Sequence, residues 1–158
     1  MKLRIAPLLL IVGVLLSAAT DISAQSTRAS VSASEVNGTF RMNFRGKFKD
    51  LSNEVKLLAL GRGKLRFAME LIYPYSLPGG EVTVNMGELD GEAAISGDTA
   101  VFSSDEFGDC KITFKFVKPG TLKISQEGTD SGCGFGHNVM SGGTYIKVNS
   151  RKPKFESQ

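Results

Sequence analysis

Residues Cys110 to Asn149 read CKITFKFVKPGTLKISQEGTDSGCGFGHNVMSGGTYIKVN and contain the clearest strand pattern in the chain. Positions 110, 112, 114 and 116 are apolar, whereas Lys and Thr stand between them, which is the alternation of a strand with one buried face. A Lys-Pro-Gly turn leads into a second alternating stretch at 121–126, and a glycine-rich segment precedes a third at 143–148. The pattern predicts a strand pair, a crossing loop and a closing strand.

The same alternation recurs upstream, with turn residues about every eight to twelve positions, as in sandwiches and barrels. Segment 54–60 is ambiguous, because Asp50 could cap a short helix there, but Gly61 and Gly63 favour a hairpin with the following strand. Gly87 and Gly91 are predicted to flank a turn. The further strands predicted lie at 36–45, 64–73, 82–86, 92–96 and 99–103.

These patterns predict an all-β fold. We expect one antiparallel barrel of about eight strands, closed or nearly closed and calycin-like in size, because closure removes exposed sheet edges. A two-sheet β-sandwich is the alternative.

The chain of 158 residues is predicted to contain one folded domain, at 35–149. Residues 1–24 have the basic start, short apolar run and small residues of a secretory signal peptide, cleaved after Ala19 or, preferably, Ala24. Residues 25–34 are predicted to be a flexible leader and 150–158 a loose basic tail. No membrane span is expected in the mature protein, so it should be secreted or periplasmic.

Charge is unevenly distributed along the chain. Cleavage after residue 24 would leave seventeen basic and fifteen acidic residues, a balance too mild to indicate nucleic-acid binding. Between Phe67 and Cys110 there is no Lys or Arg, yet nine carboxylates occur there, whereas the flanking segments are basic. Cross-strand pairing between an acidic and a basic strand would explain this pattern, and a two-signed surface that steers a charged partner is the alternative.

Cys110 and Cys133 are the only cysteines and are predicted to form a disulfide, since an exported chain meets an oxidising environment. The bond would close a loop of 24 residues and stabilise the fold by roughly 3–4 kcal/mol. It would also remove both sulfurs as nucleophiles.

The glycine-rich segment around Cys133 lacks the spacing of a phosphate-binding loop. His137 is the only histidine. The sequence near it contains no nucleophile-elbow pattern, and the chain has too few other His or free Cys residues to complete a zinc site. No catalytic residue and no metal site is therefore predicted. Phe135, His137 and Asn138 stay as a candidate contact loop.

The acidic segment 70–109 raises the question of a cation. Its residues Asp105, Glu106 and Asp109 offer oxygen ligands for calcium but not the EF-hand spacing. No cofactor is predicted, and whether this segment binds a metal is left open.

Several short motifs resemble a family of small uncharacterised secreted bacterial proteins, over roughly Asn37 to Phe155. The most specific are the Cys-Gly-Phe-Gly-x-Asn-Val segment at 133–139 and Gly-Thr-Tyr at 143–145; the others are NEVK at 53–56, LGxGKL at 60–65, GDTA at 97–100 and CKIT at 110–113. The resemblance implies export and a single domain, and it carries no catalytic residue.

We therefore expect a monomeric, non-enzymatic binding protein. Its ligand would be a small apolar molecule or an envelope or extracellular protein, and inhibition of an exported hydrolase such as a lysozyme is one specific form. The alternative is a small hydrolase that uses two carboxylates of the acidic segment.

Overall fold

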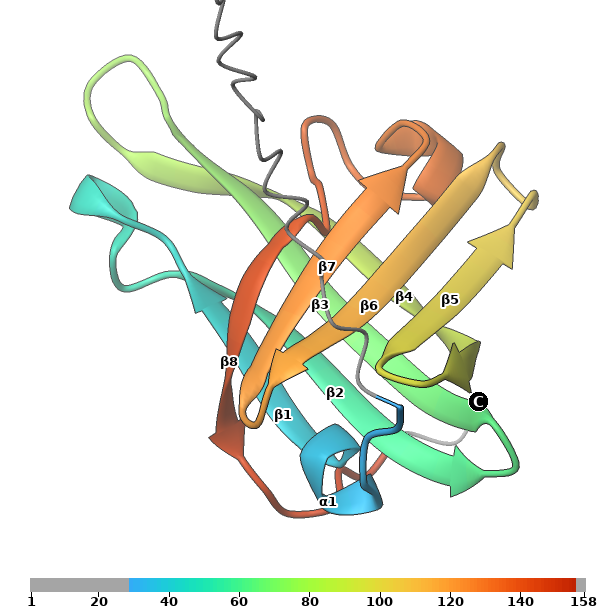
Figure 1. Cartoon of the computed structure of the whole chain (residues 1–158). Helices are drawn as coiled ribbons and strands as arrows, with labels where there is room; N and C mark the ends of the chain where they lie inside the picture. Colours follow the sequence, from blue (N-terminus) through green and yellow to red (C-terminus); the bar gives the residue numbers. More distant parts are fainter. Residues whose placement is uncertain (1–28, 156–158) are drawn as a thin grey trace, which may run out of the picture.

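The computed structural model describes residues 29–155, and these form a closed antiparallel β-barrel of eight strands (Figure 1). Each strand pairs with its neighbours in the chain, and β8 returns to pair with β1. The barrel prediction is confirmed, and the sandwich alternative is wrong. The strands are β1 (Gly38–Asn43), β2 (Ser52–Gly61), β3 (Lys64–Ser76), β4 (Val82–Ser96), β5 (Thr99–Ser104), β6 (Cys110–Lys118), β7 (Thr121–Glu127) and β8 (Gly143–Asn149).

The alternating sequence positions become the two faces of the barrel wall. In β6 the apolar residues from Cys110 to Phe116 are buried, and the lysines and threonine between them are partly exposed. Segment 54–60 lies within β2, so the hairpin prediction is confirmed and the helix alternative is wrong. Twenty buried apolar residues fill the interior, with the aromatic rings of Phe67, Phe102 and Phe114 in contact near its centre.

A short helix closes one end of the barrel. Helix α1 (Ala33–Val36) begins at a capping box made by Ser32 and Glu35, and Val36 is buried at its end. The ammonium group of Lys147 donates to the backbone carbonyls of Ser34, Glu35 and Asn37 at 2.9, 2.7 and 2.9 Å. An inward-facing lysine thereby ties β8 to the helix.

Strand β4 differs from its prediction, because 82–86 and 92–96 belong to one continuous strand of 15 residues. The turn predicted around Gly87 and Gly91 is wrong. An added Cβ at Gly87 would lie 2.8 Å from the Phe135 ring, and one at Gly91 would lie 3.1 Å from the Phe102 ring. These glycines leave room for aromatic side chains inside the barrel rather than bending the chain.

Strands β3 and β4 continue beyond the barrel as a hairpin. The ladder between β2 and β3 stops at the pair Glu54–Glu70, whereas β3 and β4 stay paired to Ser76 and Val82. We call residues 72–86 the arm; it projects from the end opposite α1 (Figure 1). Pro74, which follows the strand predicted at 64–73, lies within β3, where the ladder with β2 has ended and no donor is needed on that edge.

Ion pairs connect the acidic strand to its basic neighbour, as predicted. Lys64 lies 3.1 Å from Glu92 across β3 and β4, and the Arg66 guanidinium lies 3.9 Å from Asp90. These side chains are well exposed, so each pair contributes about 0–1 kcal/mol and mainly favours the observed register.

Both terminal segments are partly structured. Helix α1 begins inside the predicted leader, at Ala33. In the predicted basic tail, the Phe155 ring is half-buried and lies 4.8 Å from the Arg66 guanidinium on the outer face of β3. The predicted signal peptide, residues 25–28 of the leader and residues 156–158 of the tail lie outside the described residues. Among the described residues, no helix is long and apolar enough to cross a membrane.

Candidate binding surface

The loop between β7 and β8 covers the barrel end opposite α1, and we call residues 128–142 the mouth loop. Its short helix η2 (Ser131–Cys133) carries one half of the predicted disulfide, which is confirmed: Cys110 and Cys133 are bonded, with their Cα atoms 4.9 Å apart. Because Cys110 begins β6, the bond anchors the loop to the barrel wall. The loop is therefore a fixed part of this end of the barrel.

Phe135 and Val139 point into the barrel. Phe135 is only 6% exposed, and Val139 is fully buried. The backbone amide of Gly136 donates to the Met86 carbonyl at 2.9 Å, which holds the loop against β4. An added Cβ at Gly136 would lie 2.5 Å from that carbonyl, so glycine permits this close approach.

Of the three candidate contact residues, Phe135 is thus placed inside, whereas His137 and Asn138 are exposed. The His137 side chain is 82% exposed, and its backbone carbonyl accepts a hydrogen bond of 2.7 Å from the Asn85 amide. Asn138 has a φ of 63°, a left-handed conformation that asparagine tolerates better than most residues. The loop therefore offers His137 and Asn138 to a partner beside the arm.

Asp130 organises the exposed part of the mouth loop. Its two carboxylate oxygens accept from the backbone amides of Ser131 at 2.8 Å and Asn138 at 2.6 Å. These hydrogen bonds lower the pKa of Asp130 below its ordinary value, and the nearby His137 lowers it further.

We expect Asp130→Asn to loosen the loop without unfolding the barrel. In the wild type, the stabilisation from the Asp130 carboxylate should be fully present above a pH of about 3.8 and lost as the pH falls through the lower pKa of the folded state. The Asn138 amide resonance should report both changes in NMR spectra. A titration midpoint above the ordinary aspartate value would contradict this assignment.

Buried polar groups fix the base of the loop. The Tyr145 hydroxyl donates to the Ser141 carbonyl at 2.9 Å, and the Ser141 hydroxyl and amide both donate to the Gln126 side chain at 2.9 Å. Burial raises the pKa of Tyr145, so its hydroxyl stays protonated and remains a donor.

The arm is the part of this surface that sequence reasoning missed. Tyr73 and Met86 are 40% and 60% exposed, and Leu77 and Val82 are also exposed at its tip. The loop between β1 and β2 lies beside it, with the Lys47 ammonium 2.8 Å from the Ser76 hydroxyl. Strand alternation gives no sign of where β2 stops pairing, so the exposure of Tyr73 could not be predicted from it.

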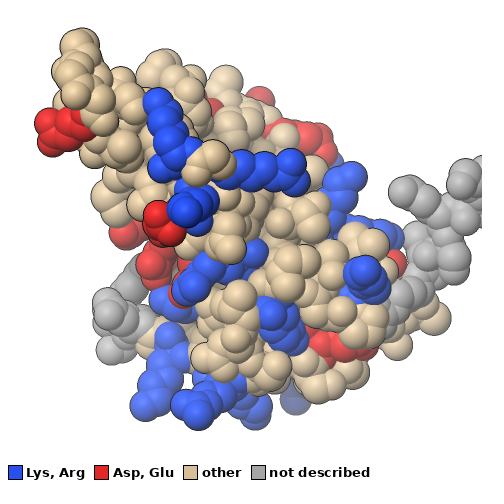
Figure 2. Space-filling view, turned by 90° about the vertical axis from the view of Figure 1, so that its left-hand side faces the viewer, with Lys and Arg blue, Asp and Glu red and all other residues tan. Residues whose placement is uncertain are grey.

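Basic residues lie next to the arm. Arg45, Lys47 and Lys49 are all exposed on the loop between β1 and β2, which includes the short helix η1 (Gly46–Phe48). Figure 2, which views the molecule from the left-hand side of Figure 1, shows Lys and Arg side chains spread over this face, with some Asp and Glu side chains among them. The arm thus combines exposed apolar side chains with neighbouring positive charge.

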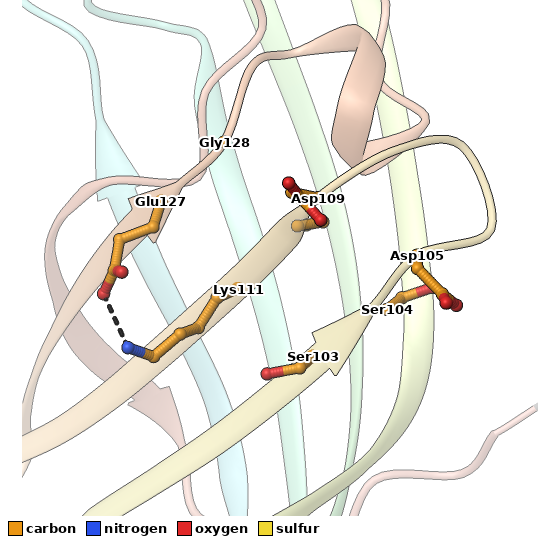
Figure 3. Close-up of a pocket in the computed structure, with 8 residues that line it drawn as sticks. Ser103, Ser104, Asp105, Asp109, Lys111, Glu127 and Gly128 are labelled. Atoms are coloured by element: carbon orange, nitrogen blue, oxygen red, sulfur yellow. Dashed lines mark hydrogen bonds and ion pairs between the residues drawn. The ribbon is translucent and has the colours of Figure 1, made fainter.

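The acidic residues near the disulfide line a separate, open cavity of about 460 Å³ on the outer face of β5 and β6 (Figure 3). Asp105 and Asp109 stand on either side of it with their carboxylates pointing in different directions, and Lys111 pairs with Glu127 at 2.8 Å. Within residues 29–155, no three His, Cys, Asp or Glu side chains form a group suited to a metal ion.

Comparisons with protein families, with curated proteins and with solved structures find no match to this chain. The resemblance to a family of small secreted bacterial proteins therefore stays a prediction. The mouth loop, the arm and the charges beside them are the features of the molecule that bear on its function.

Proposed function

We propose that this protein is a non-enzymatic, monomeric binding protein of the envelope or the extracellular space, and that its partner is a protein. The observation that carries this proposal is the arm, which holds Tyr73 and Met86 in water beyond the barrel. Exposed aromatic and methionine side chains beside a fixed loop are typical of protein interfaces. The disulfide agrees with an oxidising compartment.

A small apolar ligand inside the barrel is less well supported. The twenty buried apolar side chains occupy the interior, α1 lies across one end, and Phe135 and Val139 enter the other. A ligand chamber would require these side chains to move apart. The outer surface therefore offers the better binding site.

The charge beside the arm favours one class of partner. Arg45, Lys47 and Lys49 would complement an acidic cleft, and the apolar arm would enter it. Glycoside hydrolases have such clefts, because their chemistry uses two carboxylates that flank the substrate. We therefore propose inhibition of an exported glycoside hydrolase of the lysozyme type as the specific form of this function.

The alternative of a carboxylate-dependent hydrolase has less support. Such an enzyme needs two carboxylates at a cleft. Several acidic residues of the predicted segment instead have lysine or arginine partners: Asp98 is buried against the Lys115 ammonium at 2.7 Å, and Glu70 lies 2.7 Å from that of Lys56.

The test uses the secreted form, residues 25–158, with lysozyme as the probe. We expect it to slow lysozyme cleavage of a cell-wall suspension and to bind the enzyme in calorimetry. The double variant Tyr73→Ser/Met86→Ser should weaken both effects at least tenfold, or by about 1.4 kcal/mol of binding free energy. Loss of a tyrosine and a methionine side chain from the centre of an interface can account for a reduction of that size.

The matched control is Val117→Ser/Ile146→Ser, which removes apolar side chains of similar exposure, 49% and 52%, from the wall at β6 and β8. This variant should inhibit like the wild type. Absence of binding and inhibition at about 100 μM, which corresponds to a binding free energy weaker than about −5.5 kcal/mol, would overturn the proposal. Equal losses in both variants would also contradict a role for the arm.

A further inference from the structure

Among residues 29–155, no strand pairs with a long part of one edge of β4. Strand β4 pairs with β3 over 13 residue pairs, from Ser76–Val82 to Lys64–Ala94, but with β5 over only three, from Ala94–Val101 to Ser96–Thr99. Beyond that short ladder β5 diverges from β4 (Figure 1). This part of the barrel wall lies below the arm.

The direction of the β4 backbone groups follows from two hydrogen bonds. The Ile72 amide donates to the Asn53 side chain on the β2 side, so Ile72 does not exchange ladder bonds with Met86 opposite it. The Met86 carbonyl accepts from Gly136 on the other side. Because backbone direction alternates along a strand, residues 88, 90 and 92 also direct their amides and carbonyls away from β3.

Aromatic side chains lie behind this edge. The Phe102 ring lies 3.1 Å from the position of an added Cβ at Gly91, and the Phe135 ring lies 2.8 Å from that of an added Cβ at Gly87. Two aromatic rings therefore pack against glycines of β4 behind this edge. A strand added from outside would rest against a packed wall.

The edge is acidic on its outer face. Glu88, Asp90 and Glu92 share the solvent face of β4 at alternate positions, and all three are exposed. Pairing with a second copy through the same edge would bring these carboxylates together, which disfavours self-association. A strand that carries lysine or arginine at every second position would instead place each cation opposite a carboxylate.

The C-terminal segment of the chain lies near the same face of β4. Lys154 and Phe155 line a groove of about 450 Å³ together with Glu88 and Asp90 on the outer face of β3 and β4. The described part of this basic segment, which ends at Phe155, thus lies near two of these carboxylates and forms no ladder with β4.

We propose that the β4 edge at Glu88, Asp90 and Glu92 binds an extended, basic segment of a partner protein as an added antiparallel strand. Backbone hydrogen bonds to the edge would supply affinity, and cation–carboxylate pairs on the outer face would select the sequence. This site lies on the barrel wall, and its test does not depend on the function proposed for the arm.

The probe is the peptide Thr-Lys-Val-Lys-Val-Lys-Thr, capped at both ends, with the disulfide-bonded domain of residues 25–158. In an antiparallel pair, residues opposite Glu88, Asp90 and Glu92 share their outer face and direct their own amides toward β4. N-methylation of the three lysines should therefore weaken binding at least tenfold, whereas N-methylation of the two valines should change it by less than about threefold. Both peptides keep the same charge.

Two readouts on the protein complete the test. Peptide binding should slow amide hydrogen exchange at Glu88, Asp90 and Glu92, and leave Leu89 and Gly91, whose amides face β3, unchanged. Glu88→Lys should weaken binding at least tenfold, whereas Glu81→Lys, which changes the net charge equally at the arm tip, should not. Thermal unfolding of each variant establishes that it is folded.

Three results would overturn the proposal. The first is equal binding of the two methylated peptides, which would mean attraction by charge alone. The second is binding without slower exchange at the three edge amides. The third is absence of binding at a peptide concentration of about 1 mM, equivalent to less than about 4 kcal/mol of binding free energy.

Discussion

Replacing Phe67 with alanine is expected to lower the free energy of unfolding by about 3–5 kcal/mol. The Phe67 side chain is fully buried, and its ring centroid lies 5.1 Å from those of both Phe102 and Phe114. The variant loses the transfer free energy of the ring and leaves a cavity at the centre of the barrel. Two aromatic contacts add to that loss. Urea unfolding of the oxidised protein measures it.

Phe107→Ala is the matched control, because Phe107 is 66% exposed on the loop between β5 and β6. Its removal should change the free energy of unfolding by less than about 1 kcal/mol. Similar losses in the two variants would mean that the ring cluster around Phe67 does not form the centre of the core.

Removing the disulfide should have the second-largest effect. In the double variant Cys110→Ala/Cys133→Ala, a bond that closes a 24-residue loop is lost, and the free energy of unfolding should fall by roughly 3–4 kcal/mol. Alanine is preferable to serine because both cysteines are buried, and a serine hydroxyl there would lose its hydrogen bonds to water. Urea unfolding compares the variant with the oxidised wild type.

The same variant should loosen the mouth loop more than the barrel wall. Amide exchange at Gly136, which donates to Met86, should accelerate, whereas exchange in the ladder between β6 and β7 should follow global unfolding. A loss below about 1 kcal/mol, or detection of two free thiols in the native protein, would contradict the role assigned to the bond.

The two proposed surfaces are neighbours of opposite charge. The arm and the adjacent β1–β2 loop combine apolar side chains with Arg45, Lys47 and Lys49, whereas the β4 edge carries three carboxylates. The charge segregation seen along the sequence is therefore used in part for cross-strand pairing and in part, we propose, for selecting partners. The Tyr73→Ser/Met86→Ser and Glu88→Lys variants separate the two surfaces.

Candidate site residues were only partly predictable. The mouth loop was identified because its glycines, cysteine and lone histidine stand out in composition, and two of its three named residues are exposed. Phe135 is inside because Gly87, 48 residues earlier in the chain, leaves space for its ring. The arm was missed because its alternation continues that of the barrel strands without a break.

The local pattern of the chain was sufficient for the strands other than β4 and for the hairpins, because alternation of apolar and polar residues determines which face of a strand is buried. The presence of only two cysteines was sufficient to predict the disulfide. The local pattern was sufficient also for the pairing of acidic with basic strands. Where each ladder ends follows only from the tertiary structure. Strand β4 continues without a break through Gly87 and Gly91, and its ladder with β3 extends beyond the end of the ladder between β2 and β3. Its ladder with β5 ends after three residue pairs. Those end points depend on which side chains meet across the barrel, and that contact is set by residues far apart in sequence.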